Sequence, residues 1–388
     1  MTNIKQYTPI YFLASLGAGG LTVSFYMYLL FLIPHKGIPL ATFDHIYQTF
    51  NNTSLFNKTG IVLALLGILY FAYKHIKLLI WNIKEWNKFK KTEDYKQTKG
   101  TLKEISFMAI PLTYAMTINV MFVLGAALVP GLWNIIEYMF PMALIAFLAV
   151  GTYAFKIFGE YFIPLVLNGN KEWEENNSLV QLLSVFAFAM IGVGFAAPGA
   201  MSSIKAINAI GIFFSFIFIG TSILLGILKF ILSFHSIINN GLDEKTAPSL
   251  WIGIPIFTLV GIALVRDTFG LGHHFSDDAD LKAMLFTLTG FIFAVEILIG
   301  VFGYLIMKKV NYFETYIHSD EKDPSTYALI CPGVAFFVFG MFFIHWGLVF
   351  NGVFENYSIA HYVLIAILAI VQYKTVRTVL KLNKKFGL

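Results

Sequence analysis

The chain has 388 residues, of which 57% are hydrophobic, 17% aromatic and only 13% charged, and its mean hydropathy is +0.72. Because a soluble protein carries about a quarter charged residues, this composition excludes a soluble domain and indicates a polytopic helical membrane protein. The single cysteine excludes an intramolecular disulfide and a cysteine-cluster metal site, and the net charge of +5 is no nucleic-acid signal because the lysines lie in a few loops beside helix ends.

Ten apolar runs are long enough to cross a bilayer, which takes about 18 or more residues. They cover residues 9–33, 59–82, 105–128, 132–166, 179–201, 206–238, 249–266, 284–307, 327–350 and 358–381. No segment remains for a soluble domain, so we expect one transmembrane domain over residues 1–388. The first run lacks the short core and the cleavage site of a signal peptide, and we therefore interpret it as a helix.

Lysines mark one side of the expected bundle. The loop 84–103 is basic, and so are the start of the loop after the eighth run and the tail after the tenth. Basic loops face the cytoplasm, so both termini are predicted to be cytoplasmic. Arg266 and Arg377 are the only arginines, which suits an AT-rich bacterial genome and hence a bacterial inner membrane. The opposite side has short connections and an acidic outer loop, 267–283, with Asp267, Asp277, Asp278 and Asp280.

The runs alternate in character along the chain. Odd runs are rich in glycine, proline and small polar residues, whereas even runs are longer, aliphatic and aromatic. Four odd runs carry a proline near their N-terminal end, namely Pro9, Pro111, Pro255 and Pro332, while Pro198 lies near the far end of the fifth run. Proline frees a backbone carbonyl, and glycine permits close approach. We therefore predict an all-α fold of five tandem hairpins, with odd helices inside around a central pore and even helices outside. The alternative is that these residues serve only tight helix packing.

This pattern resembles the TehA/SLAC1 family of tellurite-resistance and C4-dicarboxylate transporters and slow anion channels. The resemblance is carried by the ten runs, the segment Leu16–Gly20 (LGAGG) and the phenylalanine-rich ninth run. It implies a homotrimer in which odd helices line a pore in each subunit and a phenylalanine of the ninth helix plugs it. Phe336, Phe337 and Phe339 fall where that plug would lie. The chain departs from the family in its displaced fifth-run proline, its long basic loop and the lack of a strict motif in the third and seventh runs.

Polar groups on the odd runs are the expected pore lining, because partial positive charge attracts an anion that a full buried charge would trap. The expected lining residues are Ser15, Gly17, Gly19, Pro111, Thr113, Thr117, Asn119, Gly194, Pro255, Thr258, Pro332 and Gly340. Lys205 and Arg266 are expected to form an electropositive pore mouth, with interfacial anchoring as the alternative. Each hydroxyl has the alternative of bonding its own helix backbone, and each phenylalanine that of plain packing.

Ionisable residues within the runs are energetically costly in a bilayer, so each is a candidate for a structural or functional role. Glu296 lies near the middle of the eighth run, where we expect a structural or subunit-contact role or a bound proton. Lys156 and Glu160 lie four residues apart and are expected to pair. The outer loop combines His273 and His274 with its aspartates, but without firm metal-ligand spacing, so no metal site or cofactor is expected. His345 lacks a second histidine at helical spacing, which argues against a cytochrome.

These observations predict a channel or transporter for small anions, occluded by phenylalanine and surrounded by lipid. We expect no enzyme, because the sequence shows no nucleophile–base pair, no phosphate loop and no cofactor motif, and no nucleic-acid partner. The alternative function is a membrane redox or chalcogen-handling protein (sulfur, selenium or tellurium) that uses Cys331, which stands beside Pro332 on a predicted pore helix. A thiol in such a helix is otherwise an inert small apolar residue. A third interpretation is a scaffold subunit without permeation.

Overall fold

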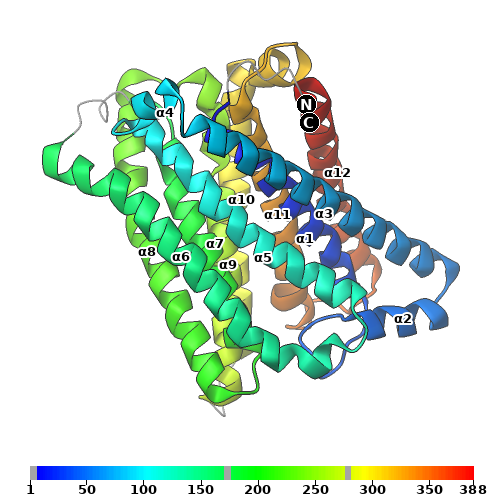
Figure 1. The fold of residues 1–388 in the computed structure, drawn as a ribbon. Helices are drawn as coiled ribbons and strands as arrows, with labels where there is room; N and C mark the ends of the chain where they lie inside the picture. Colours follow the sequence, from blue (N-terminus) through cyan, green and yellow to red (C-terminus); the bar gives the residue numbers. More distant parts are fainter. Residues whose placement is uncertain (1–6, 170–175, 276–280) are drawn as a thin grey trace.

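The computed structural model describes residues 7–169, 176–275 and 281–388, and every regular element in these residues is a helix (Figure 1). The α-helices are α1 (Phe12–Leu32), α2 (Phe43–Asn52), α3 (Leu55–Phe89), α4 (Glu93–Thr98), α5 (Ala109–Leu128), α6 (Ile136–Asn168), α7 (Leu183–Met201), α8 (Lys205–Asn240), α9 (Gly253–His274), α10 (Leu281–Lys309), α11 (Ile330–Phe342) and α12 (Ile359–Phe386). Two π-helical segments, η7 (Phe313–His318) and η9 (Phe343–Val349), follow α10 and α11.

Within these described residues, ten helical segments are long and apolar enough to cross a membrane, as the hydropathy pattern predicts. In chain order these spans are Pro9–Leu32, Leu55–Phe89, Leu102–Leu128, Leu132–Asn168, Val180–Met201, Lys205–Asn240, Glu244–His274, Leu281–Lys309, Pro324–Val349 and Ile359–Phe386. The multi-pass helical class of the protein is thereby confirmed. The seventh span extends well past its predicted end at Arg266: α9 continues to His274, and Asp267 within it accepts a hydrogen bond from the buried Ser215 of α8.

The odd-numbered spans share a way of starting. Each opens with a short 3₁₀ segment: η1 (Pro9–Tyr11), η2 (Leu102–Met108), η5 (Val180–Leu182), η6 (Glu244–Trp251) and η8 (Pro324–Leu329). Pro111, Pro255 and Pro332 are each the third residue of the α-helix that follows. In a first turn the backbone N–H has no intrahelical acceptor, so proline costs no hydrogen bond there. These prolines therefore mark the change from 3₁₀ to α-helix, whereas the prolines within an even span are Pro141 and Pro164 of α6.

Burial alternates along the chain. Within their most apolar windows the odd spans are 67, 61, 89, 61 and 78% buried, and the even spans are 28, 33, 33, 22 and 28% buried. Helices α1, α5, α7, α9 and α11 each pack against the next, and α11 packs against α1. The even spans α3, α6, α8, α10 and α12 pack against the preceding odd helix and expose large apolar side chains on their other face, as suits contact with lipid.

The two ends of the described chain lie together. The ring of Tyr11, in the 3₁₀ turn before α1, contacts the ring of Phe386 at the end of α12 at 5.8 Å. The basic segment 84–103 lies at the same end, where α3 continues to Phe89, α4 follows, and Tyr7 contacts Phe89 (Figure 1).

Helix α2 is an element that hydropathy did not predict. It lies in the connection between the first two spans and buries only Ile46. Thr42 caps its N-terminus in a reciprocal capping box with His45, and Asp44 Oδ2 accepts a hydrogen bond from the Gly131 N–H at 3.0 Å. The sequence signal was the threonine cap followed by an acidic first turn.

Candidate functional site

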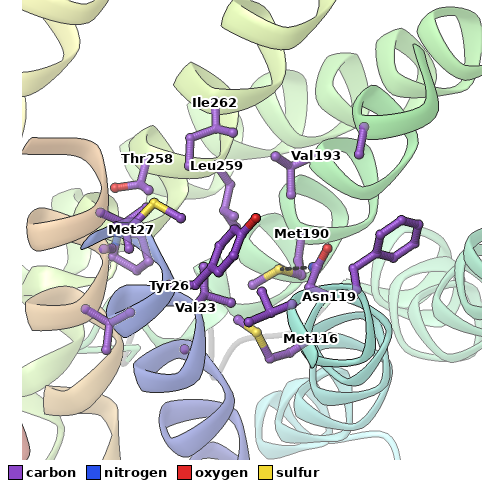
Figure 2. A pocket seen from close by; sticks show the side chains of 18 of the residues that line it. Val23, Tyr26, Met27, Met116, Asn119, Met190, Val193, Thr258, Leu259 and Ile262 are labelled. Atoms are coloured by element: carbon purple, nitrogen blue, oxygen red, sulfur yellow. Dashed lines mark hydrogen bonds between the residues drawn. The ribbon is translucent and has the colours of Figure 1, made fainter. Parts of the chain in front are cut away.

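A cavity of about 160 Å³ lies between the five odd-numbered spans (Figure 2). Its walls come from α1, α5, α7, α9 and α11, together with Phe147 of α6 and Leu40 of the connection after α1. The side chains from α1 include Val23, Tyr26 and Met27, those from α5 Met116 and Asn119, and those from α9 Thr258, Leu259 and Ile262, as Figure 2 shows. Small-molecule sites are concave and mostly apolar, and one of the places where they occur is between the helices of a bundle.

The cavity walls are mainly apolar, with a few polar groups. The Tyr26 hydroxyl donates to the Ala41 carbonyl (2.8 Å), and Asn119 Nδ2 donates to Met190 Sδ (3.5 Å). The Thr258 hydroxyl lies 2.7 Å from Glu296 Oε1. Four methionine sulfurs also belong to lining residues, those of Met27, Met116, Met190 and Met201.

Arg266 is the one charged residue among those that line the cavity in the described chain. Its Nη1 donates to the Val193 carbonyl oxygen at 2.9 Å, and no ion pair between described residues involves it. The adjacent Asp267 points elsewhere, to the Ser215 hydroxyl at 2.8 Å. A guanidinium has five N–H donors. Arg266 therefore brings a positive charge with spare donors to a mainly apolar cavity.

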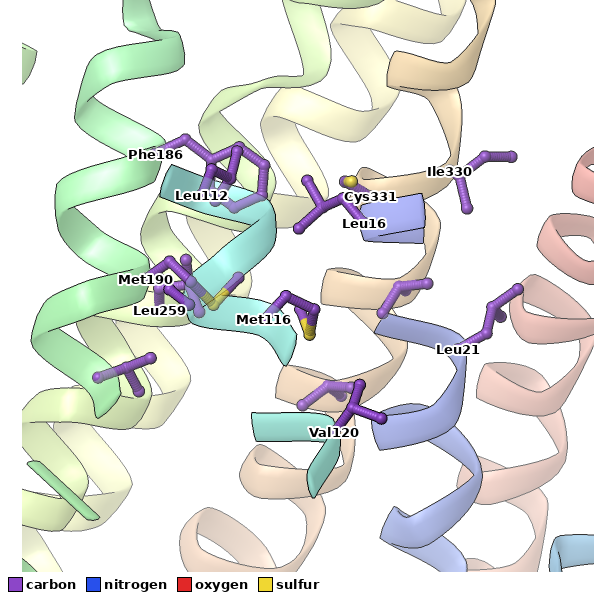
Figure 3. Packing of buried hydrophobic residues seen from close by; sticks show 14 of the residues in the cluster. Leu16, Leu21, Leu112, Met116, Val120, Phe186, Met190, Leu259, Ile330 and Cys331 are labelled. Carbon is purple, nitrogen blue, oxygen red and sulfur yellow. The ribbon is translucent and has the colours of Figure 1, made fainter. Parts of the chain in front are cut away.

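A second cavity of about 60 Å³ lies toward the N-terminal ends of the odd spans. It is lined by residues of η1, α1, η5, α7, η6, α9, η8 and α11, among them Ile10, Leu13 and Pro332. Phe186, Pro255 and Cys331 line both cavities. Figure 3 shows Phe186 of α7, Leu16 of α1 and Cys331 of α11 projecting into the core between these helices. Phe186 and Cys331 therefore lie where the two cavities adjoin, and Leu16 lines the larger one.

The structure brings together only part of the predicted pore lining. Gly17, Asn119, Pro255 and Thr258 line the larger cavity with Arg266 and Cys331, and Pro332 lines the smaller one. The remaining predicted residues, Ser15, Gly19, Pro111, Thr113, Thr117, Gly194 and Gly340, are not among the described lining residues of either cavity.

Several of those residues have contacts between helices instead. Ser15 Oγ and Thr117 Oγ1 lie 3.1 and 3.0 Å from Nδ1 and Nε2 of His75, which joins α1, α3 and α5. Thr113 donates to the Ala109 carbonyl (2.7 Å), one turn back on its own helix. Gly194 and Gly340 face Phe147 and Leu368, so their lack of a side chain admits a neighbouring helix.

The three phenylalanines predicted as a plug lie among neighbouring rings and helices. The Phe336 ring contacts Phe293 of α10 at 4.9 Å, and the Phe337 ring contacts Tyr28 of α1 at 5.3 Å. Phe339 is fully buried, 6.4 Å from Phe342 between ring centroids. The phenylalanine of α11 that lines the larger cavity is Phe342.

Three charged residues near helix ends contact neighbouring groups outside the larger cavity. Lys205 is exposed, with its ammonium 4.7 Å from the Phe275 ring, so it does not line the cavity with Arg266. Glu137 accepts hydrogen bonds from the Ser202 hydroxyl and the Ser203 N–H. Glu160, expected to pair with Lys156, instead pairs with Lys99 at 2.7 Å.

Sequence reasoning missed several buried polar residues, among them His361, Lys229 and His75. His361 of α12 bonds His345 across 16 positions of chain, a separation that helical spacing cannot reveal. Lys229 of α8 is 1% exposed and donates to Ser184 Oγ (2.9 Å) and the Gln181 carbonyl (3.2 Å), beside the rings of Phe158 and Tyr161. The sequence feature that could have indicated Lys229 is a single lysine within an apolar run. His75 is fully buried in α3.

Metal ligands do not gather in the part of the chain that the structure describes: no group of three histidine, cysteine or acidic residues there could hold an ion. Asp277, Asp278 and Asp280 of the predicted acidic loop lie outside the described residues. No protein-family model matches the chain, and no curated protein matches it.

Proposed function

We propose that the protein passes small anions across a membrane through the chain of two cavities between its odd-numbered spans. The observation that carries the proposal is Arg266, whose guanidinium forms no ion pair with another described residue and lines a mainly apolar cavity between five helices. A single cation with spare donors attracts an anion, and hydroxyl and amide groups complete its coordination without a second charge that would hold it.

The packing of the spans supports the predicted architecture. We infer five tandem hairpins whose odd members form an inner ring, because α1, α5, α7, α9 and α11 contact one another in sequence and are the more buried spans. The lysines of segment 84–103 lie at the end of the bundle where Tyr11 contacts Phe386. We therefore place that end on the cytoplasmic side of a bacterial inner membrane. The homotrimer implied by the TehA/SLAC1 resemblance remains part of this proposal.

Apolar side chains keep the proposed passage closed. Phe186 lines both cavities and Phe342 lines the larger one, which makes these two rings the first choice for the occluding groups. Phe336, Phe337 and Phe339 are the alternative set. Replacing each of the five by alanine in turn distinguishes the sets: we expect Phe186→Ala or Phe342→Ala to raise anion conductance in planar bilayers, and larger increases from the other three would assign the plug to them.

The test of the anion proposal is iodide flux into proteoliposomes, measured by quenching of a trapped fluorophore. Arg266→Gln removes a charge-assisted hydrogen bond and should lower the rate roughly ten- to a hundredfold. Arg377→Gln is the matched control, because Arg377 is the other arginine of the chain and lies exposed on α12. Equal rates for the two variants and the unmodified protein would exclude Arg266 as the anion-binding group.

The alternative function, chalcogen handling by Cys331, also has a structural observation in its favour. Cys331 is the single cysteine and lines both cavities, and four methionines line the larger one. Cys331→Ala separates the two functions: unchanged iodide flux favours the anion passage, whereas loss of flux for selenite alone, an oxyanion that oxidises thiols, favours a thiol reaction.

A further inference from the structure

Glu296 is a buried acid beside the proposed anion passage, because its partner Thr258 lines the larger cavity. It lies near the middle of the 29-residue helix α10 and is 0% exposed, although α10 turns Phe291, Leu298 and Phe302 outward. The acid therefore faces the interior of the bundle at a depth where the bilayer offers no water. A packing position would favour a hydrocarbon side chain, so the carboxyl group needs another explanation.

Its contacts leave one oxygen free. Thr258 Oγ1 lies 2.7 Å from Oε1, and Oε2 is a buried oxygen without a hydrogen-bond partner among the described residues. Helix α10 packs against α9, η6, α11 and η9. Besides the histidine pair that ends α9, the titratable side chains on these elements are Arg266, Asp267, Glu244, Lys245, Cys331 and His345. None of them forms a described hydrogen bond or ion pair with Glu296.

A carboxylate in this position would have one hydroxyl donor and no cation. Burial of an ionised group without a counter-charge costs several kcal/mol, and the group takes up a proton instead. A protonated Glu296 can donate through Oε1 to Thr258 Oγ1. The hydroxyl hydrogen of Thr258 then no longer bonds Glu296 and is free to point elsewhere.

The Thr258 hydroxyl can then donate its hydrogen bond to a group in the cavity. It lines the larger chamber, as do Ile262 and Arg266, which follow it at intervals of four residues on the same face of α9. Arg266 is thus about 12 Å farther along the helix. When Glu296 is ionised, the hydroxyl hydrogen points to the carboxylate, and the cavity loses this donor.

We propose that Glu296 is a proton-binding site coupled through Thr258 to anion binding in the central cavity, an inference that rests on the proposed anion passage. Protonation of Glu296 makes Thr258 a donor to the anion, and ionisation withdraws it. Since coupling between two sites is reciprocal, a bound anion also raises the affinity of Glu296 for its proton. Anion binding is then accompanied by proton uptake.

The full-length protein in proteoliposomes tests the coupling with iodide as the probe. We expect the flux at pH 5 to exceed the flux at an alkaline pH at which Glu296 is ionised roughly tenfold, the contribution of one hydrogen bond to an ion. Glu296→Gln offers an amide donor to Thr258 permanently, so its flux should be independent of pH and equal to the acid limit. Thr258→Val should be slow at every pH. Glu137→Gln is the control, because Glu137 lies outside the cavity, and it should keep the pH dependence.

Infrared spectroscopy of the purified protein gives a readout that does not depend on transport. The unmodified protein at pH 7 should show a carbonyl band of a protonated carboxyl group that is absent from Glu296→Gln and shifts when iodide is added. Absence of that band, or pH-dependent flux in Glu296→Gln, would overturn the coupling while leaving the anion passage intact. A shifting band without any iodide flux would instead retain the coupled site and reject the passage.

Discussion

His361 donates a hydrogen bond from its Nε2 to Nε2 of His345, with 3.0 Å between the two nitrogens. The direction follows from the outer partners. The Tyr357 N–H donates to His361 Nδ1 (3.1 Å), so the hydrogen of this ring is on Nε2. His345 Nδ1 lies 2.7 Å from the Met341 carbonyl, which only accepts, so its hydrogen is on Nδ1. Two neutral rings thereby connect the π-helical end of the ninth span to the start of α12.

Removing the acceptor of this pair should destabilise the protein. His345→Phe leaves the Nε2–H of His361, a fully buried side chain, without an acceptor, which costs about 1–3 kcal/mol of the free energy of unfolding. His345→Gln retains an acceptor and should lose less. The measurement is the unfolding temperature in detergent. Equal losses for both variants would mean that packing on Phe31, whose ring stacks on His345 at 4.2 Å, accounts for the effect.

The fold was largely predictable because its main determinant is hydropathy. Ten runs of sufficient length correspond to the ten spans, and the small residues of the odd runs correspond to the spans that are more buried. The ends were harder to place. Asp267 looked like the start of a loop, but it lies within α9 and accepts a hydrogen bond from the Ser215 hydroxyl of another helix. The amphipathic helix α2 is too polar for any hydropathy window.

Gly19 illustrates how a small residue is used between helices. A Cβ at this position would lie 2.7 Å from Met116 Cγ and 2.8 Å from His75 Nδ1. Gly19→Ala should therefore force α1 away from α3 and α5 and lower the free energy of unfolding by about 1–3 kcal/mol. Gly60→Ala is the control, because no atom lies within 4 Å of its Cβ. Chemical unfolding in mixed micelles compares the two, and similar stabilities would contradict the packing role.

The site was less predictable than the fold, because polar residues on an inner helix face either the centre or a neighbouring helix, and helical periodicity alone does not separate these faces. Thr258 and Asn119 line the cavity, whereas Ser15 and Thr117 bond His75. The decisive partner, His75, lies on an even span that appeared to be plain lipid-facing helix. Phenylalanine presents the same difficulty: Phe342 and Phe336 belong to one helix, yet one lines the cavity and the other contacts α10.

Lys99 fastens the basic segment to the bundle. Partial burial disfavours its charged form, but hydrogen bonds to Glu160 and Glu104 outweigh that effect and raise the pKa of Lys99 above its ordinary value of 10.5. A raised folded-state pKa gives stability that is complete below the unfolded value and lost as the pH rises through the folded one. Lys99→Met should thus lower the unfolding temperature by an amount that stays constant from about pH 7 to 9.5 and shrinks only at higher pH.

Lys96→Met is the matched control for this ion pair. Lys96 and Glu93 are paired at 3.0 Å but are 71% and 68% exposed, and such surface pairs contribute little. A loss of stability in Lys96→Met as large as that in Lys99→Met would show that the total charge of the segment, and not the contact with α6, is responsible.

The connection that contains α2 contributes one residue to the wall of the larger cavity. Leu40 lines that cavity, the next carbonyl, of Ala41, accepts the hydroxyl of Tyr26, and Thr42 then caps α2. The cap depends on His45, because the Thr42 N–H donates to His45 Nδ1 (3.3 Å), which accepts only when that nitrogen carries no proton. Acid should therefore destabilise the N-terminal end of α2, which follows Leu40 of the cavity wall.

The pH at which α2 loosens follows from His45. Burial, and secondarily the nearby His35, lower the pKa of His45 below its ordinary value of 6.5, against the opposing effect of Asp44. A base with a lowered folded-state pKa gives stability that is complete above the unfolded value and declines as the pH falls below about 6.5. Hydrogen exchange of amides 43–52, corrected for the intrinsic pH dependence of exchange, should therefore be faster at pH 5.5 than at pH 7.5.

His45→Gln keeps the capping box without a titrating group, so its corrected exchange should be the same at both pH values. His45→Ala should exchange rapidly at both. Acid-induced exchange that persists in His45→Gln would place the titrating group elsewhere in the connection.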